Sequence, residues 1–347
     1  MLKLLAKTVF IINFSATVKA LSSTLPIICA SQTSNKEKQM KTHSERQIRR
    51  HRWLTLLLLQ TAFSIPLSLQ AAENNTTPRE EMMQKQDSHS NVHSSAIHFQ
   101  KVDNFRDVAG NLQPYQNNRG ETLQQGRLYR ANALLLSPEE AEKLASLNIT
   151  HIYDLRTPGE IALHPDSEIP GATWHNINLL GWDDIEPVRV GFTQKPEITI
   201  AGAEEIYLNF VNDPITRAQI GTLLTSIAQN EGNQLFHCSG GKDRTGWVSA
   251  LLQYIAGVPQ EIIVADFLAS NDYSRGSITQ SFNKMANEKG VAAAIAFSPF
   301  LGVQDDWLLM AFAEAEKNYG SVDNYLLEGL AITPETKAEL REKLLMP

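Results

Sequence analysis

The stretch Gln-Leu-Phe-His-Cys-Ser-Gly-Gly-Lys-Asp-Arg-Thr-Gly-Trp-Val, residues 234–248, decides the fold of this 347-residue chain. It opens with a short, mostly apolar run, 234–238, which predicts a buried central strand. A glycine-containing turn follows, and a helix is then predicted from about Thr245 to Ala256, where Gly257 and Pro259 end it. A buried strand that leads through a tight turn into a helix is typical of α/β folds, which place their sites at the carboxyl ends of parallel strands.

The rest of the domain alternates predicted helices with apolar segments. Ser137 as N-cap, Pro138 at the first helical position and Glu140 in a capping box begin one helix. Ile149 to Leu155 is predicted to be a buried strand. Helices are predicted over 137–147, 203–229 (with Pro214 as a candidate break), 259–270, 303–317 and 334–345. We therefore predict an α/β fold with a central, mainly parallel sheet flanked by helices.

The N-terminal region has the pattern of a targeting segment. Three arginines at 49, 50 and 52 precede an apolar run over 53–69, and alanines follow at 71 and 72. This order is typical of a secretory signal peptide. We predict a leader over 1–72 with Met40 as the candidate true start, a disordered linker over 73–98 and a folded domain over 99–347. We expect export to the periplasm or full secretion, without a stable membrane span after cleavage; a retained N-terminal anchor is the alternative.

Charge is spread unevenly along the chain. The chain has 31 Lys and Arg and 38 Asp and Glu. Ten of the basic and two of the acidic residues lie in 1–72, so residues 73–347 hold 21 basic and 36 acidic residues, a net charge of −15. A domain this acidic is a poor partner for nucleic acid. A site for an anionic substrate must therefore create its own local positive field.

The chain has two cysteines, Cys29 and Cys238. Once the leader is removed, Cys238 has no partner for an internal disulfide. It is either an inert buried thiol or a reactive nucleophile, and the residues around it favour the second interpretation.

Five residues separate Cys238 from Arg244 in the predicted turn. Successive backbone N–H groups at the N-terminus of a helix can bind the oxygens of a phosphoryl group, and Gly240 and Gly241 let the turn close tightly. Arg244 can bind two of these oxygens with its planar guanidinium. The same positive field favours a thiolate at Cys238 that attacks phosphorus and forms a cysteinyl-phosphate. Thr245 is expected to donate a hydrogen bond to that sulfur.

This loop, residues 237–246, resembles the Cys-(x)5-Arg signature of protein tyrosine phosphatases, extended by His237, Thr245 and Gly246. Beyond the loop, the chain is similar to one bacterial branch of that superfamily, the secreted tyrosine and lipid phosphatases with a Gly-Lys-Asp-Arg loop. Three further segments carry the resemblance: 104–110, 154–160 and 319–345.

The resemblance implies a tyrosine-phosphatase-like domain over 99–347 that hydrolyses phosphotyrosine, with phosphoserine, phosphothreonine or phosphoinositides as further substrates. It implies a phosphorylated protein or phospholipid as partner, and neither a metal nor a cofactor. The residues expected to bind phosphate are Ser239, Gly240, Gly241, Lys242, Asp243 and Arg244. Residues 276–302 are either a helical lid over the pocket or an ordinary packed helix pair.

The proton donor for the leaving oxygen is an open question in the sequence. Many tyrosine phosphatases keep an Asp in a Trp-Pro-Asp loop, and this chain has no such triplet. Gly-Trp-Asp-Asp at 181–184 is an imperfect match, so Asp183 and Asp184 are candidates, and Asp213 is a third. In the resembling branch the Asp within the loop is implicated, which favours Asp243 as a catalytic residue beside Cys238 and Arg244. The alternative role of Asp243 is to shape the loop.

Several charged residues are expected to support the loop. Asp154 and Arg156 end a predicted buried strand, where they either line the pocket or form a buried ion pair, and the same alternatives apply to Arg106 and Asp107. His237 is expected to orient the loop. Lys242 either recognises substrate or is an exposed lysine at the mouth of the pocket; in both cases it adds positive charge.

Three other functions compete with this interpretation. A dedicated phosphoinositide or inositol-phosphate phosphatase is the nearest, and a wide pocket with Lys242 would favour it. A sulfurtransferase with a cysteine loop disagrees with the loop sequence. A phosphate-binding pseudoenzyme disagrees with the presence of both Cys238 and Arg244.

Overall fold

The computed structural model describes residues 99–185 and 199–347, with the backbone alone for residues 199 and 200. The leader over 1–72 and the linker over 73–98 lie outside the described residues and stay predictions. The helices are α4 (Pro138–Ala145), α5 (Pro158–Leu163), α7 (Thr199–Asn212), α8 (Pro214–Gln229), α9 (Arg244–Ala256), α10 (Gln260–Tyr273), α11 (Arg275–Lys289), α12 (Val291–Leu301), α13 (Asp305–Tyr319), α14 (Val322–Asn324), a π-helix (Tyr325–Gly329) and α15 (Pro334–Leu344).

A five-stranded sheet forms the centre of the domain, in the order β1-β2-β5-β3-β4. The strands are β1 (Arg106–Asp107), β2 (Leu128–Ala131), β3 (Ile149–Asp154), β4 (Thr173–Asn176) and β5 (Asn233–His237). Only the two-residue β1 runs antiparallel to its neighbour; the other pairs are parallel. The predicted α/β fold with a mainly parallel sheet is confirmed, and the predicted strand before Cys238 is the central strand β5.

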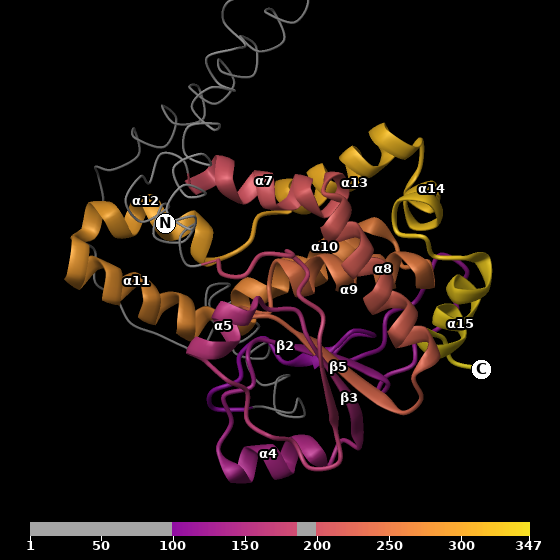
Figure 1. Ribbon diagram of the computed structural model, residues 1–347, viewed down its shortest axis with the longest axis horizontal. Coiled ribbons are helices and arrows are strands. Elements are labelled where there is room, and N and C mark those ends of the chain that lie inside the picture. The colour runs from indigo at the N-terminus through magenta and orange to yellow at the C-terminus, as the bar shows by residue number, and fades with distance from the viewer. Residues whose placement is uncertain (1–98, 186–198) are drawn as a thin grey trace, which may run out of the picture. The chain divides into compact units, whose positions relative to one another are not determined.

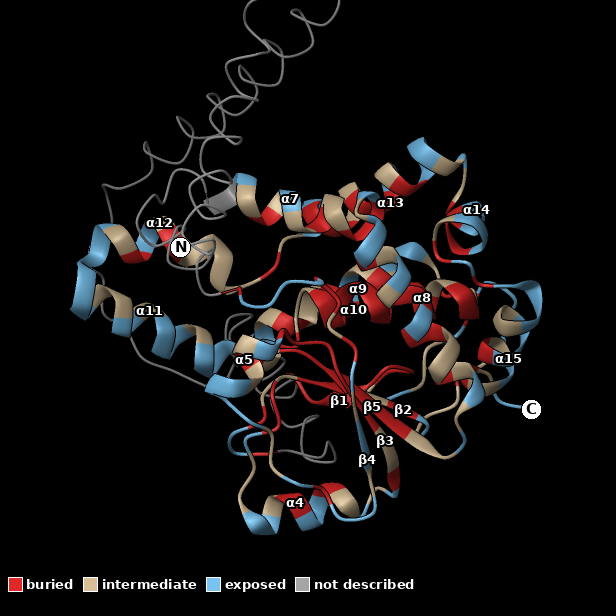
Figure 2. Ribbon diagram, viewed as in Figure 1, coloured by how far each residue is buried: buried red, intermediate tan, exposed pale blue. Residues whose placement is uncertain are grey.

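Helices cover both faces of the sheet, as Figure 1 shows. One hydrophobic cluster packs six helices against the sheet: α7, α8, α9, α10, α13 and α15. A smaller cluster packs α4 against the opposite face. Burial is concentrated in the sheet and in α9 (Figure 2). Because β5 is covered on both faces and paired on both edges, it is buried along nearly its whole length, including its polar residues Gln234 and His237.

The predicted helix signals correspond to real helix ends. Ser137 caps α4 and forms the expected capping box with Glu140. The long predicted helix 203–229 is two helices, because Asp213 and Pro214 end α7 and begin α8. Gly257 ends α9 in the left-handed conformation (φ 85°) that glycine adopts most readily. The sequence does not predict β1, β2 or β4, which have two to four residues each.

The helices α11 and α12 pack on each other beside the rest of the domain (Figure 1). No residue of α11 is buried, and α12 buries only Ala294 and Phe297. Within residues 99–185 and 199–347, no helix has both the length and the apolar character needed to cross a membrane.

Candidate active site

The loop between β5 and α9 borders a cavity of about 350 Å³. Cys238 lies at its base, almost fully buried, at the carboxyl end of the central strand. The remaining walls come from the predicted loop, from α5 and α7 and from the α11–α12 pair. The lining residues are Asp103, Asn132, Glu160, Leu180, Ile185, Ile206, Cys238, Ser239, Gly240, Lys242, Asp243, Arg244, Ser274, Ser277, Ile278, Ser281, Phe297, Phe300 and Leu301.

Gly241 is the one predicted phosphate-binding residue that does not line this cavity. Its φ is +64°, and an added Cβ would lie 2.5 Å from the carbonyl oxygen of Ala131. Its own carbonyl accepts hydrogen bonds from Arg130 Nη2 (2.8 Å) and Asn104 Nδ2 (2.7 Å). Gly241 therefore lets the loop pack directly against β2, in a conformation that a side chain would strain.

Glu160 binds Arg244 end-on. Each terminal nitrogen of the guanidinium donates to one carboxylate oxygen of Glu160 at 2.7 Å, and Nη1 also donates to the Leu155 carbonyl at 3.3 Å. A guanidinium has five N–H groups, so the Nε–H and one Nη2–H stay without a partner among the described residues. These two lie on the same side edge of the group, which is the geometry that binds two oxygens of one phosphate.

The charge state of this pair is well defined. Burial raises the pKa of Glu160, but the charge of Arg244 and hydrogen bonds from Arg244, Ser239 and the backbone of Thr157 have the larger, opposite effect. The pKa is lowered to about 2. Burial lowers the pKa of Arg244, but Cys238 and Glu160 more than compensate and hold it above its ordinary value. Glu160 is thus a fixed carboxylate that orients Arg244, and it has no proton to donate near neutral pH.

Asp243 lines the cavity from the N-cap position of α9. Its Oδ1 accepts a hydrogen bond from the Tyr207 hydroxyl (2.9 Å), and its Oδ2 accepts one from Lys242 Nζ (2.8 Å). Lys242 Nζ also donates to the Gly302 carbonyl (3.0 Å) and lies 5.0 Å from the centre of the Phe300 ring. Lys242 therefore lines the cavity and joins the loop to the end of α12.

Of the four candidate proton donors, only Asp243 lines the cavity within the described part of the chain. Asp213 caps α8 by accepting from the Thr216 N–H (2.7 Å). Asp183 and Asp184 are exposed beside α5, where the Asp183 carbonyl accepts from the Gly159 N–H (2.9 Å). The geometry favours Asp243 over the other three.

Behind the loop lies a second buried ionic cluster, which we call the rear cluster: Arg106, Arg130 and Asp266. Asp266 accepts from Arg106 Nε (3.0 Å) and Arg130 Nη1 (3.2 Å). All three nitrogens of Arg106 donate hydrogen bonds to side-chain oxygens: Nε to Asp266, Nη1 to Asn104 and Nη2 to Ser270. Burial and the neighbouring Arg106 lower the pKa of Arg130 to about 9, so it stays charged near neutral pH. Arg106 supports the loop from behind and does not face the cavity.

Asp154 and Arg156 form a buried two-point ion pair, with Nε–Oδ1 at 2.8 Å and Nη2–Oδ2 at 2.7 Å. Arg156 also pairs with Asp166 (2.7 Å), whose other neighbour is His237 Nε2 (3.1 Å). Burial raises the pKa of Asp166, but His237 and Arg156 lower it to about 2. Asp154, Asp166 and His237 have metal-ligand spacing. The Arg156 guanidinium, however, already serves both carboxylates as their cation. Asp154 and Arg156 thus form a buried ion pair and do not line the cavity.

Two supporting residues differ from expectation. The Thr245 hydroxyl is buried and has no hydrogen-bond partner within the described residues, so the predicted bond to Cys238 is absent here. Asp107 accepts from the backbone N–H groups of Ala109 and Gly126 and thus holds a turn rather than the cavity. Burial raises its pKa to about 6 despite these two hydrogen bonds.

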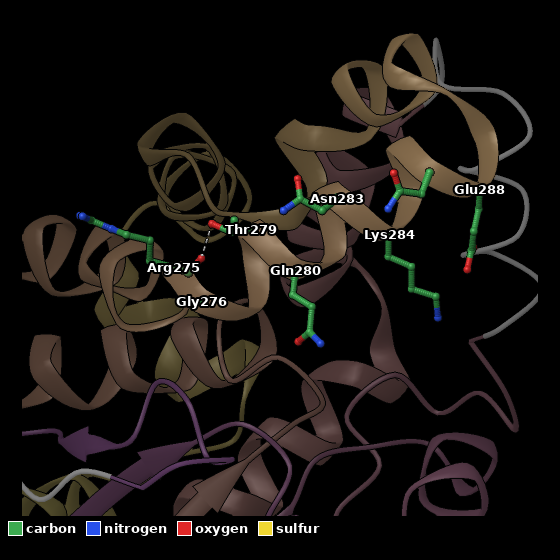
Figure 3. A pocket seen from close by; sticks show the side chains of 8 residues that line it. Arg275, Gly276, Thr279, Gln280, Asn283, Lys284 and Glu288 are labelled. Atoms are coloured by element: carbon green, nitrogen blue, oxygen red, sulfur yellow. Dashed lines mark hydrogen bonds between the residues drawn. The ribbon is translucent and has the colours of Figure 1, made fainter.

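The predicted lid segment forms one side of the cavity. Ser274, Ser277, Ile278 and Ser281 line it from the start of α11, and Phe297, Phe300 and Leu301 line it from α12. A separate hollow runs along α11, and its described lining comes from this helix alone, including Arg275, Gln280, Lys284 and Glu288 (Figure 3). It shares no lining residue with the Cys238 cavity.

Four residues that the structure brings to the loop are not predicted from the sequence: Tyr207, Asp166, Arg130 and Asp266. Glu160 lies within the segment 154–160, but no role is predicted for it. A signal for Glu160 exists, because it follows Thr157 and Pro158 in a capping box that fixes its position on α5. The other four carry no local signal.

Comparison with known proteins agrees with this geometry. Residues 97–346 match the model of a tyrosine phosphatase family. A protein of Cupriavidus necator named as a tyrosine-protein phosphatase is 30% identical over 236 residues, which are 67% of this chain and 84% of that protein. The triple specificity protein phosphatase PtpB of Mycobacterium tuberculosis is 27% identical over 276 residues, 70% of this chain and 96% of PtpB. A tyrosine-protein phosphatase of Nostoc commune is 30% identical over 160 residues, 45% of this chain and 52% of that protein. The chain belongs to the tyrosine phosphatase family.

Proposed function

We propose that this phosphatase hydrolyses phosphotyrosine through a cysteinyl-phosphate intermediate, with phosphoserine and phosphothreonine as further substrates. The observation that carries the proposal is the mixed lining of the cavity. Cys238 and Arg244 line it from the loop and the start of α9, and Phe297 and Phe300 line it from α12. The first group suits a phosphoryl dianion, and the second suits an aromatic ring.

In the first step, the Cys238 thiolate attacks phosphorus and forms an S–P bond while the ester P–O bond breaks. The electron pair of that bond goes to the leaving oxygen, which takes a proton from the Asp243 carboxyl. Arg244, held by Glu160, stabilises the charge on the phosphoryl oxygens throughout the transfer.

In the second step, water attacks phosphorus and the S–P bond breaks, which returns the thiolate. The Asp243 carboxylate now accepts the proton of that water and is restored as an acid. One residue can serve in both directions because the leaving oxygen and the attacking water occupy equivalent positions.

Phosphoinositides are the second candidate substrate. Ser274, Ser277 and Ser281 line the cavity with hydroxyl groups, and Lys242 adds a cation. Hydroxyl groups and a lysine suit a polyol that carries additional phosphates. The name of the mycobacterial relative describes three specificities for that protein. For this chain, we propose phosphoinositides as a lesser activity.

The test is a metal-free substrate panel with Cys238→Ser as the matched control. We expect the highest kcat/KM on a phosphotyrosine peptide, lower values on a phosphoserine peptide and a phosphoinositide in mixed micelles, and turnover by the variant on none of them. The variant should still bind the phosphotyrosine peptide, since the loop and Arg244 are unchanged. Turnover by Cys238→Ser near the wild-type rate would disprove the mechanism, and a preference for the phosphoinositide would exchange the two substrate assignments.

We also propose that the domain acts outside the cytoplasm. The proposal is supported by the leader pattern over 1–72. The mature N-terminus, measured by intact mass after expression in a bacterial host, should lie near Ala72. Recovery of the uncleaved chain from the cytoplasm would contradict it.

A further inference from the structure

Tyr207 is the only described residue outside the loop that hydrogen-bonds the Asp243 side chain. It comes from α7, 36 positions away in the sequence, and its hydroxyl donates to Asp243 Oδ1 at 2.9 Å. Its ring is fully buried and packs edge-on against Phe210 (5.3 Å) and Phe267 (6.1 Å), and lies 5.8 Å from the ring of Trp307. Contacts on several sides leave this ring little freedom, so the hydroxyl is a fixed point in the site.

Asp243 occupies the N-cap position of α9 but does not act as a cap. Aspartate at this position usually accepts a hydrogen bond from the helix backbone, and here its side chain makes no such bond. The carboxyl group instead turns into the cavity, between Tyr207 and Lys242. The Asp243 carboxyl group therefore lacks the usual hydrogen bond to its own helix. The hydrogen bond from Tyr207 of α7 takes its place.

We propose that Tyr207 is the positioning residue for the proton donor of this reaction, and that its hydroxyl holds Asp243 Oδ1 so that Oδ2 carries the proton to the leaving oxygen. The inference rests on the proposed role of Asp243. The two oxygens are not equivalent: a buried, packed ring holds Oδ1, whereas Oδ2 is held by a lysine that divides its ammonium group between Asp243, the Gly302 carbonyl and the Phe300 ring. When Lys242 releases Oδ2, that oxygen is the one free to take up and deliver a proton.

Tyr207 keeps its own proton throughout. Burial, and then the neighbouring Asp243, raise the pKa of this hydroxyl well above its ordinary value, so it donates to the carboxyl group without titrating itself. The other charged groups near the hydroxyl are Cys238 and Arg130. Arg244 and Lys242 are the cations near the carboxyl group. None of them touches Oδ1, so the Tyr207 contact can be removed alone.

The experiment compares Tyr207→Phe with Asp243→Asn and with the double variant, on phenyl phosphate and on 4-nitrophenyl phosphate. Phenolate needs a proton to leave, whereas nitrophenolate leaves unaided. We expect Tyr207→Phe to lose about tenfold in kcat/KM on phenyl phosphate and less than about threefold on the nitrophenyl ester, since a general acid contributes roughly 10²–10⁴-fold and only its alignment is lost. The ratio of the two rates does not depend on the folded fraction of the variant.

The pH profile supplies a readout that a purely structural role would not move. Removing a donor from a carboxylate disfavours its charged form, so the basic limb of kcat/KM on phenyl phosphate should move to higher pH in Tyr207→Phe. Tyr325→Phe is the matched control. It removes another buried hydroxyl in contact with α7, one that donates to the Phe210 carbonyl (2.8 Å), and should leave both the ratio and the basic limb unchanged.

The outcomes separate the two hypotheses. In the Asp243→Asn background, Tyr207→Phe should cause no further selective loss on phenyl phosphate. Equal losses on both esters for Tyr207→Phe, beside a selective loss for Asp243→Asn, would overturn the inference and leave Asp243 as the acid. Equal losses for Asp243→Asn would overturn the proton-donor assignment and the role of Tyr207 with it.

Discussion

Two arginine–carboxylate clusters contact the same loop from opposite sides, and they use their N–H groups differently. In the front cluster, Arg244 with Glu160, the side edge of the guanidinium is left for a ligand. In the rear cluster, every nitrogen of Arg106 donates to a protein oxygen, and Arg130 donates to Asp266 and to the Gly241 carbonyl. Both clusters are buried ion pairs. The number of uncommitted N–H groups that face a cavity distinguishes a ligand site from a support.

The clusters also differ in net charge. Glu160 neutralises Arg244, whereas a single Asp266 faces both Arg106 and Arg130, which leaves about one positive charge behind the loop. The anionic substrate therefore meets a field that the rear cluster supplies and a specific contact that the front cluster supplies. This arrangement solves the problem set by the acidic remainder of the chain, residues 73–347, which carry a net charge of −15.

The largest effect should follow from breaking the front cluster. Arg244→Lys should reduce kcat/KM on 4-nitrophenyl phosphate roughly a thousandfold, because an ammonium cannot bind two phosphoryl oxygens and Glu160 at the same time. Steady-state kinetics measures this loss, and urea unfolding should show a much smaller change in stability. A loss below about threefold would mean that Arg244 does not contact the phosphoryl group.

Breaking the rear cluster should instead reduce stability. Asp266→Ala leaves two buried guanidinium groups without their carboxylate and should lower the free energy of unfolding by about 4 kcal/mol. The KM of the folded fraction should change little. Asp272→Ala is the control on the same helix, because it removes an exposed pair with Arg275 and should cost less than about 0.5 kcal/mol. A large rise in KM with unchanged stability would place Asp266 functionally with the front cluster.

Which arginine faces the cavity and which supports the loop cannot be predicted from the sequence, for a physical reason. The strand, loop and helix around Cys238 are specified by neighbouring residues, so 234–256 is predicted almost residue by residue. The partners of the loop arginines are not local: Glu160 lies 84 positions from Arg244, and Asp266 lies 160 positions from Arg106. A buried arginine has the same local pattern whether its N–H groups end on protein or on substrate. Tyr207 is hidden for the same reason, since on an apolar helix it is indistinguishable from a core aromatic.

Acid should affect the front cluster at a defined pH. The pKa of Glu160 is held at about 2, below the ordinary value of 4.5, so its contribution to stability is complete above pH 4.5 and is lost as pH falls towards 2. The free energy of unfolding should fall by about 2 kcal/mol across this window, beyond the fall seen in Glu160→Gln. Urea denaturation at several pH values measures both. Parallel pH dependence in the two proteins would show that Glu160 is not the titrating group.

The smallest expected effect concerns Asp107, whose pKa is shifted in the direction opposite to that of Glu160. Asp107 is buried like Glu160 but has no arginine partner; it accepts only two backbone N–H groups, and its pKa is raised to about 6. A group of this kind binds its proton more tightly in the folded state. Its contribution is complete below pH 3.8 and is lost as pH rises through 6. Wild-type stability should therefore fall between pH 4 and 6 relative to Asp107→Asn, by on the order of 1 kcal/mol, because the half-buried turn at Gly126 can relax. If stability rises over this range relative to the variant, the two N–H groups outweigh burial, and a carboxylate in this domain needs no cation to stay charged.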